Sequence, residues 1–155
     1  MNVIFTDYDG VFHPTGQAVP LHWKDIKIGE NFFLPKLVRP FVRFCHQFDI
    51  KLVVSSTWRF DFSIRQLNEV FDGLIIGTTP HISRIPAGQP MRWLEVQGFL
   101  SDYPEIKAFA IIDDQADLFP QELENLVVTD GHVGLVPADL VRLKRRLVSS
   151  KNSAS

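Results

Sequence analysis

The sequence predicts a single α/β domain with a mainly parallel sheet and helices on both faces. Short apolar runs rich in β-branched residues alternate with longer stretches of helical spacing along the chain. With 155 residues and a hydrophobic content of 45%, the chain can build one substantial core but not two domains of ordinary size. We therefore expect one domain over residues 1–148 and a polar tail over residues 149–155.

Apolar runs of strand length and segments of helical period define the expected elements. Strands are expected at residues 2–7, 50–55, 73–77, 107–113 and 125–129. Helices are expected at residues 34–47, 61–71, 90–101, about 116–123 and about 137–148. Pro40 should kink or break the first helix, because its ring clashes with the preceding turn. Prolines and glycines interrupt every regular period in residues 11–33, so a loop or small flap is expected there.

The first expected strand ends at two aspartates, Asp7 and Asp9. Residues 3–5 are apolar β-formers, and Asp9-Gly10 is a typical turn, so both carboxylates should lie at the carboxyl end of the strand. In parallel α/β sheets, ligands bind at that end. Neighbouring carboxylates repel each other unless a cation or a proton lies between them, and Mg²⁺ prefers carboxylate oxygens. The pair indicates a divalent metal site, although a turn and a cap are the commoner explanation of an isolated D-x-D-G.

Further polar residues follow two other expected strands. Ser55 and Ser56 come after the second, while Asp113 and Asp114 come after the fourth, with Asp117 one turn later. Hydroxyls at a helix N-terminus can donate to a phosphate oxygen or simply cap the helix, and the acids could likewise be caps. Since strands alternating with helices favour parallel pairing, all these residues should meet at one edge of the sheet. Together they predict a metal site beside a phosphate cradle.

These residues resemble the motifs of the haloacid dehalogenase (HAD) superfamily of phosphohydrolases, in the family's order, from Asp7 to about Phe119. The motifs are Asp7-Tyr8-Asp9-Gly10-Val11, then Ser55 after IKLVV, then an arginine, then Asp113-Asp114 with Asp117. Arg92 is the preferred arginine and Arg84 its rival. The runs VVSSTWR and IIDD, together with Thr79-Pro80 and the R-x-x-E-V of Arg92 to Val96, further resemble a small branch described as the HAD domain of Swiss Army Knife RNA repair proteins.

The resemblance implies a three-layer Rossmann-like fold and a residue-by-residue mechanism. Asp7 would be the nucleophile and Asp9 the general acid/base, while Ser55, Ser56 and Arg92 would bind the substrate phosphate. Mg²⁺ would be held by Asp7, the main-chain carbonyl of Asp9 and Asp113, with Asp114 and Asp117 as outer or alternative ligands. The spacing between the motifs leaves no room for a large cap domain. An open site suits a bulky phosphorylated substrate, such as a nucleic-acid end or a phosphoprotein.

Several alternatives stay open from the sequence. The same fold could serve a non-catalytic phosphate- or partner-binding module, and the same site a phosphotransferase or a dehalogenase. Trp58 and Arg59 could contact the substrate, although a tryptophan at a helix start is more often packed in the core. The basic residues within 142–146 could form a nucleic-acid patch, but a solvated charged face is the better explanation.

Charge and cysteine content set further limits. Sixteen basic against eighteen acidic residues give a net charge of −2, so the chain as a whole does not attract nucleic acid or anionic membrane. The single cysteine, Cys45, lies in an apolar helical segment and is expected to serve packing. The N-terminus carries no basic leader, and Asp7 interrupts its apolar run. We expect a cytoplasmic protein with no membrane partner; its oligomeric state stays open.

Overall fold

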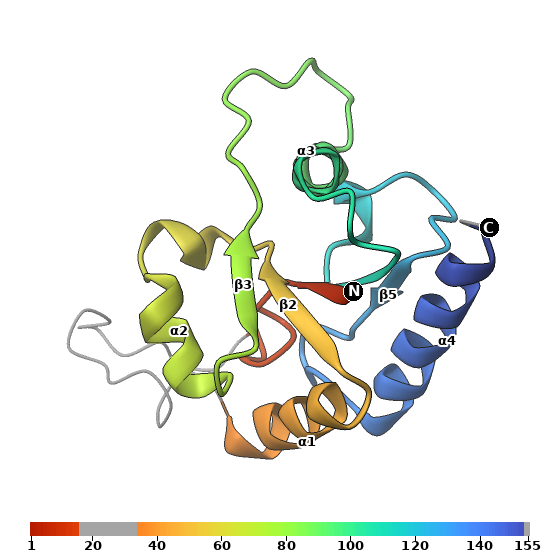
Figure 1. The fold of residues 1–155 in the computed structure, drawn as a ribbon. Helices are drawn as coiled ribbons and strands as arrows, with labels where there is room; N and C mark the ends of the chain where they lie inside the picture. Colours follow the sequence, from red (N-terminus) through yellow and green to blue (C-terminus); the bar gives the residue numbers. More distant parts are fainter. Residues whose placement is uncertain (16–33, 154–155) are drawn as a thin grey trace.

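Parallel strands form the centre of the computed structural model, which describes residues 1–15 and 34–153 (Figure 1). The strands in these residues are β1 (Asn2–Thr6), β2 (Ile50–Val54), β3 (Ile75–Thr78), β4 (Ala108–Asp113) and β5 (Leu126–Val128). They form one sheet in the order β3-β2-β1-β4-β5, with every neighbouring pair parallel. The predicted parallel sheet is confirmed, although the third strand begins at Ile75 rather than at residue 73.

Helices cover both faces of this sheet, as predicted (Figure 1). The helices are α1 (Pro35–Gln47), α2 (Ile64–Val70), α3 (Met91–Asp102) and α4 (Pro137–Ser153). Apolar residues of α1, α2 and α4 share a core with Ile4 and Leu52 on one face, and α3 packs on Val3 and Phe5 on the other. Side chains alternate between the two faces of a strand, so β1 contributes to both cores. The result is the expected three-layer architecture.

The first helix differs from its prediction because it does not end or break at Pro40. Proline removes one backbone hydrogen bond from a helix. Here α1 continues to Gln47, and its residues Phe41, Phe44 and Cys45 are buried in the core. Burial of that apolar face stabilises the turns on both sides of the proline. Cys45 is a packing residue, as predicted, and burial raises the pKa of its thiol to about 12.

Three other expected helices have different bounds in the structure. The segment predicted at 116–123 forms only a 3₁₀ turn, η3 (Ala116–Leu118), because Pro120 lacks an N–H donor and Glu122 has a φ of 57°. The segment predicted at 61–71 begins later, as α2, since Ser63 and Gln66 form a capping box; the 3₁₀ turn η2 (Thr57–Phe60) precedes it. The last helix continues to Ser153, through much of the expected polar tail.

The loop expected at 11–33 can be assessed only at its start. Val11 and Phe12 are buried in the larger core, and the N–H of Thr15 donates to the carbonyl of Gly131 at 2.7 Å. Residues 11–15 are therefore part of the packed domain. The remaining positions, 16–33, lie outside the described residues, and the flap stays a prediction. None of the helices that the structure describes is both long and apolar enough to cross a bilayer.

Candidate active site

Backbone hydrogen bonds continue the parallel ladder one residue beyond the central strands. The N–H of Ser55 donates to the carbonyl of Thr6 at 2.9 Å, and the N–H of Asp7 donates to the carbonyl of Ile112 at 3.0 Å. Thr6 is also in register with Val54 and Ile112. Asp7, Ser55 and the residues that end β4 therefore leave the sheet side by side, as the sequence predicts.

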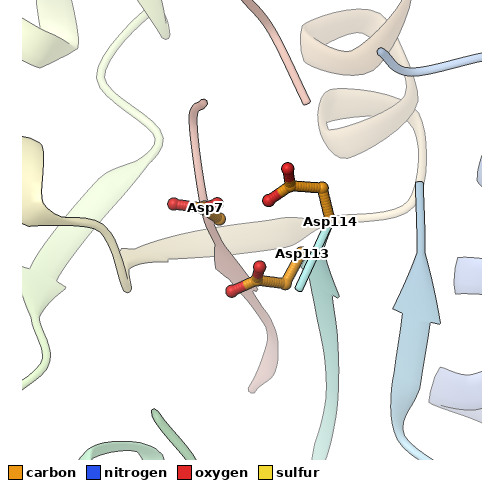
Figure 2. Close-up of side chains that lie close together, drawn as sticks. All are labelled: Asp7, Asp113 and Asp114. Carbon is orange, nitrogen blue, oxygen red and sulfur yellow. The ribbon is translucent and has the colours of Figure 1, made fainter. Parts of the chain in front are cut away.

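Three carboxylates meet at this edge (Figure 2). Asp7, Asp113 and Asp114 each place an oxygen within 4.8 Å of the other two, close enough to share one cation. Asp7 and Asp113 are buried, and Asp114 is half-buried. Among the described residues, Asp113 Oδ2 and Asp114 Oδ1 are buried without a hydrogen-bond donor. Buried acceptors are rarely left unsatisfied, so these oxygens indicate a ligand site.

The electrostatics of the cluster also favour a cation. Burial raises the pKa of Asp7, the charge of Asp113 raises it further, and Arg92 opposes the shift only in part. The pKa of Asp113 is likewise raised, chiefly by burial. Without a cation, the site would have to hold protons at neutral pH. The cluster offers three carboxylates, two of them with a buried oxygen that has no hydrogen-bond partner among the described residues. Mg²⁺ prefers such hard oxygen donors, so the residues fit this metal.

Two glycines make room for Asp114. Gly10 has a φ of +76°, and a Cβ at this position would lie 2.3 Å from Asp114 Oδ2. A Cβ at Gly131 would lie 2.8 Å from the same oxygen. The turn at Gly10 is held by Thr129, whose buried hydroxyl donates to the Gly10 carbonyl at 2.8 Å. Asp114, expected as an outer or alternative ligand, is thus fitted closely into the acidic cluster.

Asp9 has a different surrounding from the other acids. Its carboxylate is half-buried and accepts a hydrogen bond from the indole Nε1 of Trp58, with a distance of 3.0 Å to Oδ2. The acidic cluster of Asp7, Asp113 and Asp114 does not include the Asp9 side chain. This arrangement suits the expectation that Asp9 contributes its main-chain carbonyl to a metal and its side chain to proton transfer.

The two serines after β2 are used differently. Ser55 is 1% exposed, and its hydroxyl has no hydrogen-bond partner among the described residues. Ser56 is also buried, but its Oγ accepts the backbone N–H of Trp58 at 3.3 Å and so caps η2. Ser55 therefore has the free donor that a phosphate oxygen would use, while the capping alternative considered for these hydroxyls holds for Ser56.

The two candidate arginines differ in position: Arg92 is buried near the acidic cluster, whereas Arg84 is exposed. Arg92 is 6% exposed on α3, and its charge lowers the pKa of both Asp7 and Asp113. Arg84 is exposed in the segment between β3 and α3. Burial beside the carboxylates favours Arg92 as the phosphate-binding arginine.

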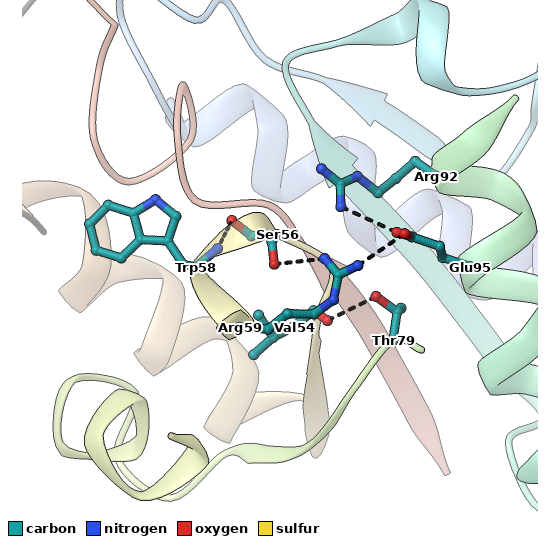
Figure 3. A network of polar contacts seen from close by, with 7 residues as sticks. All are labelled: Val54, Ser56, Trp58, Arg59, Thr79, Arg92 and Glu95. Atoms are coloured by element: carbon teal, nitrogen blue, oxygen red, sulfur yellow. Dashed lines mark hydrogen bonds and ion pairs between the residues drawn. The ribbon is translucent and has the colours of Figure 1, made fainter. Parts of the chain in front are cut away.

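A buried ionic network surrounds Arg92 (Figure 3). Glu95 accepts from Arg92 Nη1 at 3.3 Å through Oε2 and from Arg59 Nη2 at 2.9 Å through Oε1. Arg59 Nη1 also donates to the carbonyl of Ser56 at 2.8 Å. Arg59 and Trp58, considered as substrate contacts, bind residues of the site, and a contact with substrate stays a prediction. The R-x-x-E and Trp-Arg pairs were visible in the sequence, but spacing could not show that they meet.

Asp117 is the one expected site residue that the structure places elsewhere. It lies exposed in η3 and is not part of the acidic cluster. It lines a separate cavity of about 770 Å³ together with Phe119 and Pro120. The acidic cluster therefore forms without Asp117, and the role of Asp117 as an outer or alternative metal ligand stays a prediction.

Comparison with known protein families agrees with this geometry. One family model, described as the HAD domain in Swiss Army Knife RNA repair proteins, matches residues 3–140. Since the match covers most of the chain, the chain belongs to this family. A search of curated proteins gave no match. The expected HAD relationship and the small α/β fold without a cap are therefore confirmed for the described residues.

Proposed function

We propose that this member of the HAD family is a Mg²⁺-dependent phosphomonoesterase that acts through a covalent aspartyl-phosphate. The observation that carries the proposal is the cluster of Asp7, Asp113 and Asp114 at the carboxyl end of the sheet. Ser55 and Arg92 lie beside it, one with a free buried hydroxyl and the other with a buried cation. Carboxylates next to phosphate-binding donors are what phosphoryl transfer requires.

In the first step, a carboxylate oxygen of Asp7 attacks phosphorus and forms a P–O bond. The bond from phosphorus to the leaving oxygen breaks, and that oxygen takes a proton from Asp9. In the second step, water attacks the phosphorus of the aspartyl-phosphate and gives a proton to Asp9. The bond to Asp7 then breaks and inorganic phosphate is released. Asp9 ends each cycle protonated, as it began.

The other residues of the proposed site would have separate roles when substrate binds. Asp7, Asp113 and the Asp9 carbonyl would hold Mg²⁺, with Asp114 as a further ligand. When bound, the metal offsets the repulsion between the Asp7 carboxylate and the phosphate. Ser55 and Arg92 would bind the non-bridging oxygens of the phosphate, where negative charge develops during transfer. Ser56, which caps η2, would hold the segment that carries Ser55.

The substrate we propose is a bulky phosphate monoester, either a nucleic-acid end or a phosphoprotein. The matched family is described by its occurrence in RNA repair proteins, which supports the first class. The fold has no inserted cap among the described residues, so a large leaving group has access. We place the protein in the cytoplasm. A dehalogenase, a phosphotransferase and a binding module are weaker candidates, because the full acid set suits metal-assisted hydrolysis.

Hydrolysis of an aryl phosphate by purified wild type and by Asp7→Asn tests this proposal, each with Mg²⁺ and with a chelator. We expect turnover only for wild type with metal. Asp102→Asn, which removes an exposed carboxylate at the end of α3, is the matched control and should retain activity. Undiminished turnover in Asp7→Asn would exclude the nucleophile, and an inert wild type that binds Mg²⁺ would favour the binding module.

A further inference from the structure

Two adjacent side chains of the short turn η2, Trp58 and Arg59, extend away from each other (Figure 3). Trp58 reaches the carboxylate of Asp9, and Arg59 reaches Glu95, which also binds Arg92. We propose that η2 is a positioning element with two arms. In the Trp58 arm, Trp58 orients the acid/base Asp9. In the Arg59 arm, Arg59 shares the Glu95 carboxylate with Arg92, which orients Arg92 and keeps a net positive charge on the three side chains. This inference rests on the proposed function, and it assigns roles to Trp58, Arg59 and Glu95.

The contact of Trp58 is well defined at both ends. Its Nε1 lies 3.0 Å from Asp9 Oδ2, a normal length for a hydrogen bond to a carboxylate. The indole ring is fixed by a stacked contact with Phe62 at 5.2 Å and an edge contact with Tyr8 at 6.2 Å. A donor held on a packed ring restricts the rotation of the carboxyl that accepts from it.

Orientation matters for Asp9 because proton transfer needs hydrogen-bond reach of the leaving oxygen. Asp9 lies in the turn between β1 and Gly10, and the hydrogen bond from Trp58 is the contact that holds its carboxylate among the described residues. The Trp58 hydrogen bond engages Oδ2 and thereby fixes the plane of the carboxyl. Substrates whose leaving group needs a proton, namely alkyl phosphates, depend on this orientation, whereas nitrophenolate leaves without one.

The Arg59 arm works through charge. The side chains of Arg59 and Glu95 are 4% and 3% exposed, and that of Arg92 is 8% exposed. Glu95 alone with Arg92 would form a neutral pair, which attracts an anion weakly. With Arg59 sharing the same carboxylate, the buried group of three side chains keeps one net positive charge. Asp7 and Asp113 face this charge in the metal-free protein, since Arg92 lowers the pKa of both. With Mg²⁺ on these carboxylates, the positive charge would be available to a phosphate group, because buried charges are costly unless they are paired.

Both arms also start from the phosphate-binding segment itself. Ser56 caps η2 through its Oγ, and its carbonyl accepts from Arg59 Nη1. Ser55, with its free hydroxyl, directly precedes this cap. One short turn therefore connects the predicted phosphate donor, the predicted acid/base and the predicted phosphate-binding arginine, which come from β2, β1 and α3.

Trp58→Phe tests the first arm, since it keeps an aromatic ring and removes the N–H donor. With Mg²⁺ present, kcat/KM is measured for an alkyl phosphate and for 4-nitrophenyl phosphate. We expect the ratio of alkyl to aryl kcat/KM to fall about tenfold, a fraction of the usual contribution of a general acid. The inhibition constant of inorganic phosphate should stay within about twofold, because this arm does not reach Arg92.

Arg59→Gln tests the second arm, with Arg59→Lys as the variant that restores the charge. Inorganic phosphate is the probe, measured by calorimetry and as a competitive inhibitor in the presence of Mg²⁺. We expect Arg59→Gln to weaken phosphate binding about tenfold, since one unit of nearby buried charge is lost. Arg59→Lys should recover part of this loss, and the alkyl-to-aryl ratio should keep its wild-type value in both variants.

The two variants serve as controls for each other. If Trp58→Phe slows both substrates equally, or if Arg59→Gln binds phosphate as wild type does, that arm has only a structural role and the inference is wrong. A wild type that neither hydrolyses phosphate esters nor binds phosphate would instead overturn the proposed function. Calorimetric binding separates the two failures, because it does not require turnover.

Discussion

Gly10 controls where Asp114 can lie, because it has no side chain. A Cβ at this position would come within 2.3 Å of Asp114 Oδ2, in a backbone conformation with a φ of +76°. We predict that Gly10→Ala displaces Asp114, destabilises the domain by about 2 kcal/mol or more and weakens Mg²⁺ binding at least about tenfold. Thermal unfolding and metal titration by calorimetry measure the two effects.

Gly73→Ala is the matched control for this variant. Gly73 has nearly the same φ, +73°, but nothing lies within 4 Å of the added Cβ. It should lose about 1 kcal/mol from backbone strain alone and keep the Mg²⁺ affinity of wild type. Equal metal affinity in Gly10→Ala and Gly73→Ala would contradict the fitting of Asp114 into the metal site.

Asp7 makes the metal-free protein sensitive to pH. Burial, with the charge of Asp113, raises the pKa of Asp7 above its ordinary value of 3.8, so the native state holds this proton more tightly than the unfolded chain. The free energy of unfolding therefore falls as the pH rises from about 4 through the raised pKa of the native state. Without metal at pH 8, we predict that Asp7→Asn unfolds about 5 °C above wild type.

This difference should shrink toward pH 4, where the unfolded chain also binds the Asp7 proton and folding no longer requires proton uptake by the wild type. Added Mg²⁺ should raise the unfolding temperature of wild type more than that of Asp7→Asn, because it binds the native carboxylates. The exposed control Asp102→Asn should follow wild type at every pH. If calorimetry finds no dependence of the Asp7→Asn difference on pH, the buried repulsion inferred at this site is wrong.

At the scale of elements, the end of β5 supports the turn that follows β1. The Thr129 side chain is buried, its hydroxyl donates to the Gly10 carbonyl at 2.8 Å, and its N–H donates to the carbonyl of Asp113 at 3.0 Å. We predict that Thr129→Val costs about 1–3 kcal/mol, because the buried carbonyl of Gly10 loses its donor. Mg²⁺ binding should weaken as the turn relaxes.

Thr129→Ser keeps the hydroxyl and should retain most of the metal affinity lost in Thr129→Val. Urea unfolding with and without Mg²⁺, together with metal titration, compares the two variants. A Thr129→Val protein that loses stability but binds Mg²⁺ as wild type does would show that β5 supports the fold without positioning the metal ligands.

The elements also show which features can be read from a sequence. The acids and hydroxyls at strand ends were predictable, because alternating strands and helices bring the carboxyl ends of parallel strands to one edge. The helix predicted at 116–123 was wrong: Pro120 could be recognised as a helix breaker, but the positive φ of Glu122 is not evident from its residue type. The continuation of α1 through Pro40 depends on tertiary packing, which local propensity does not contain.

Contacts across the site were the hardest to predict. The pairs Trp58–Asp9 and Arg59–Glu95 are distant in sequence, and each joins residues whose types fit several other roles. Glu95 lies one helical turn from Arg92, a spacing that equally suits an exposed ion pair. Only the packing of α3 against the sheet buries this pair beside the acidic cluster.

At the scale of the whole molecule, the charge distribution predicts weak dependence on salt. The net charge is −2, and two basic residues of α4 are engaged: Arg142 with Asp139, and Lys144 over the ring of Phe48 at 4.2 Å. These two contacts leave Arg145 and Arg146, so the solvated charged face expected at 142–146 stays a prediction. For a single-stranded oligonucleotide with a terminal phosphate, we expect binding through about one or two phosphates.

A plot of log kcat/KM against log salt for that oligonucleotide should therefore have a slope between about −0.7 and −1.4. Inorganic phosphate inhibition at each salt concentration serves as the control for the contribution of the site alone. A slope of about −3 or steeper would reveal an extended basic track for the nucleic-acid backbone. It would contradict recognition confined to the end of the substrate.

The central claim, covalent catalysis by Asp7, is tested most directly by trapping the phosphorylated enzyme. Wild type is mixed with excess phosphate ester and Mg²⁺, quenched in acid during steady-state turnover, and digested for peptide mass spectrometry. We predict a phosphoryl group on Asp7, in the peptide that contains this residue, and its absence when chelator replaces Mg²⁺. Turnover with phosphate on another residue, or with no phosphorylated enzyme in rapid-quench samples through the first turnover, would contradict the account.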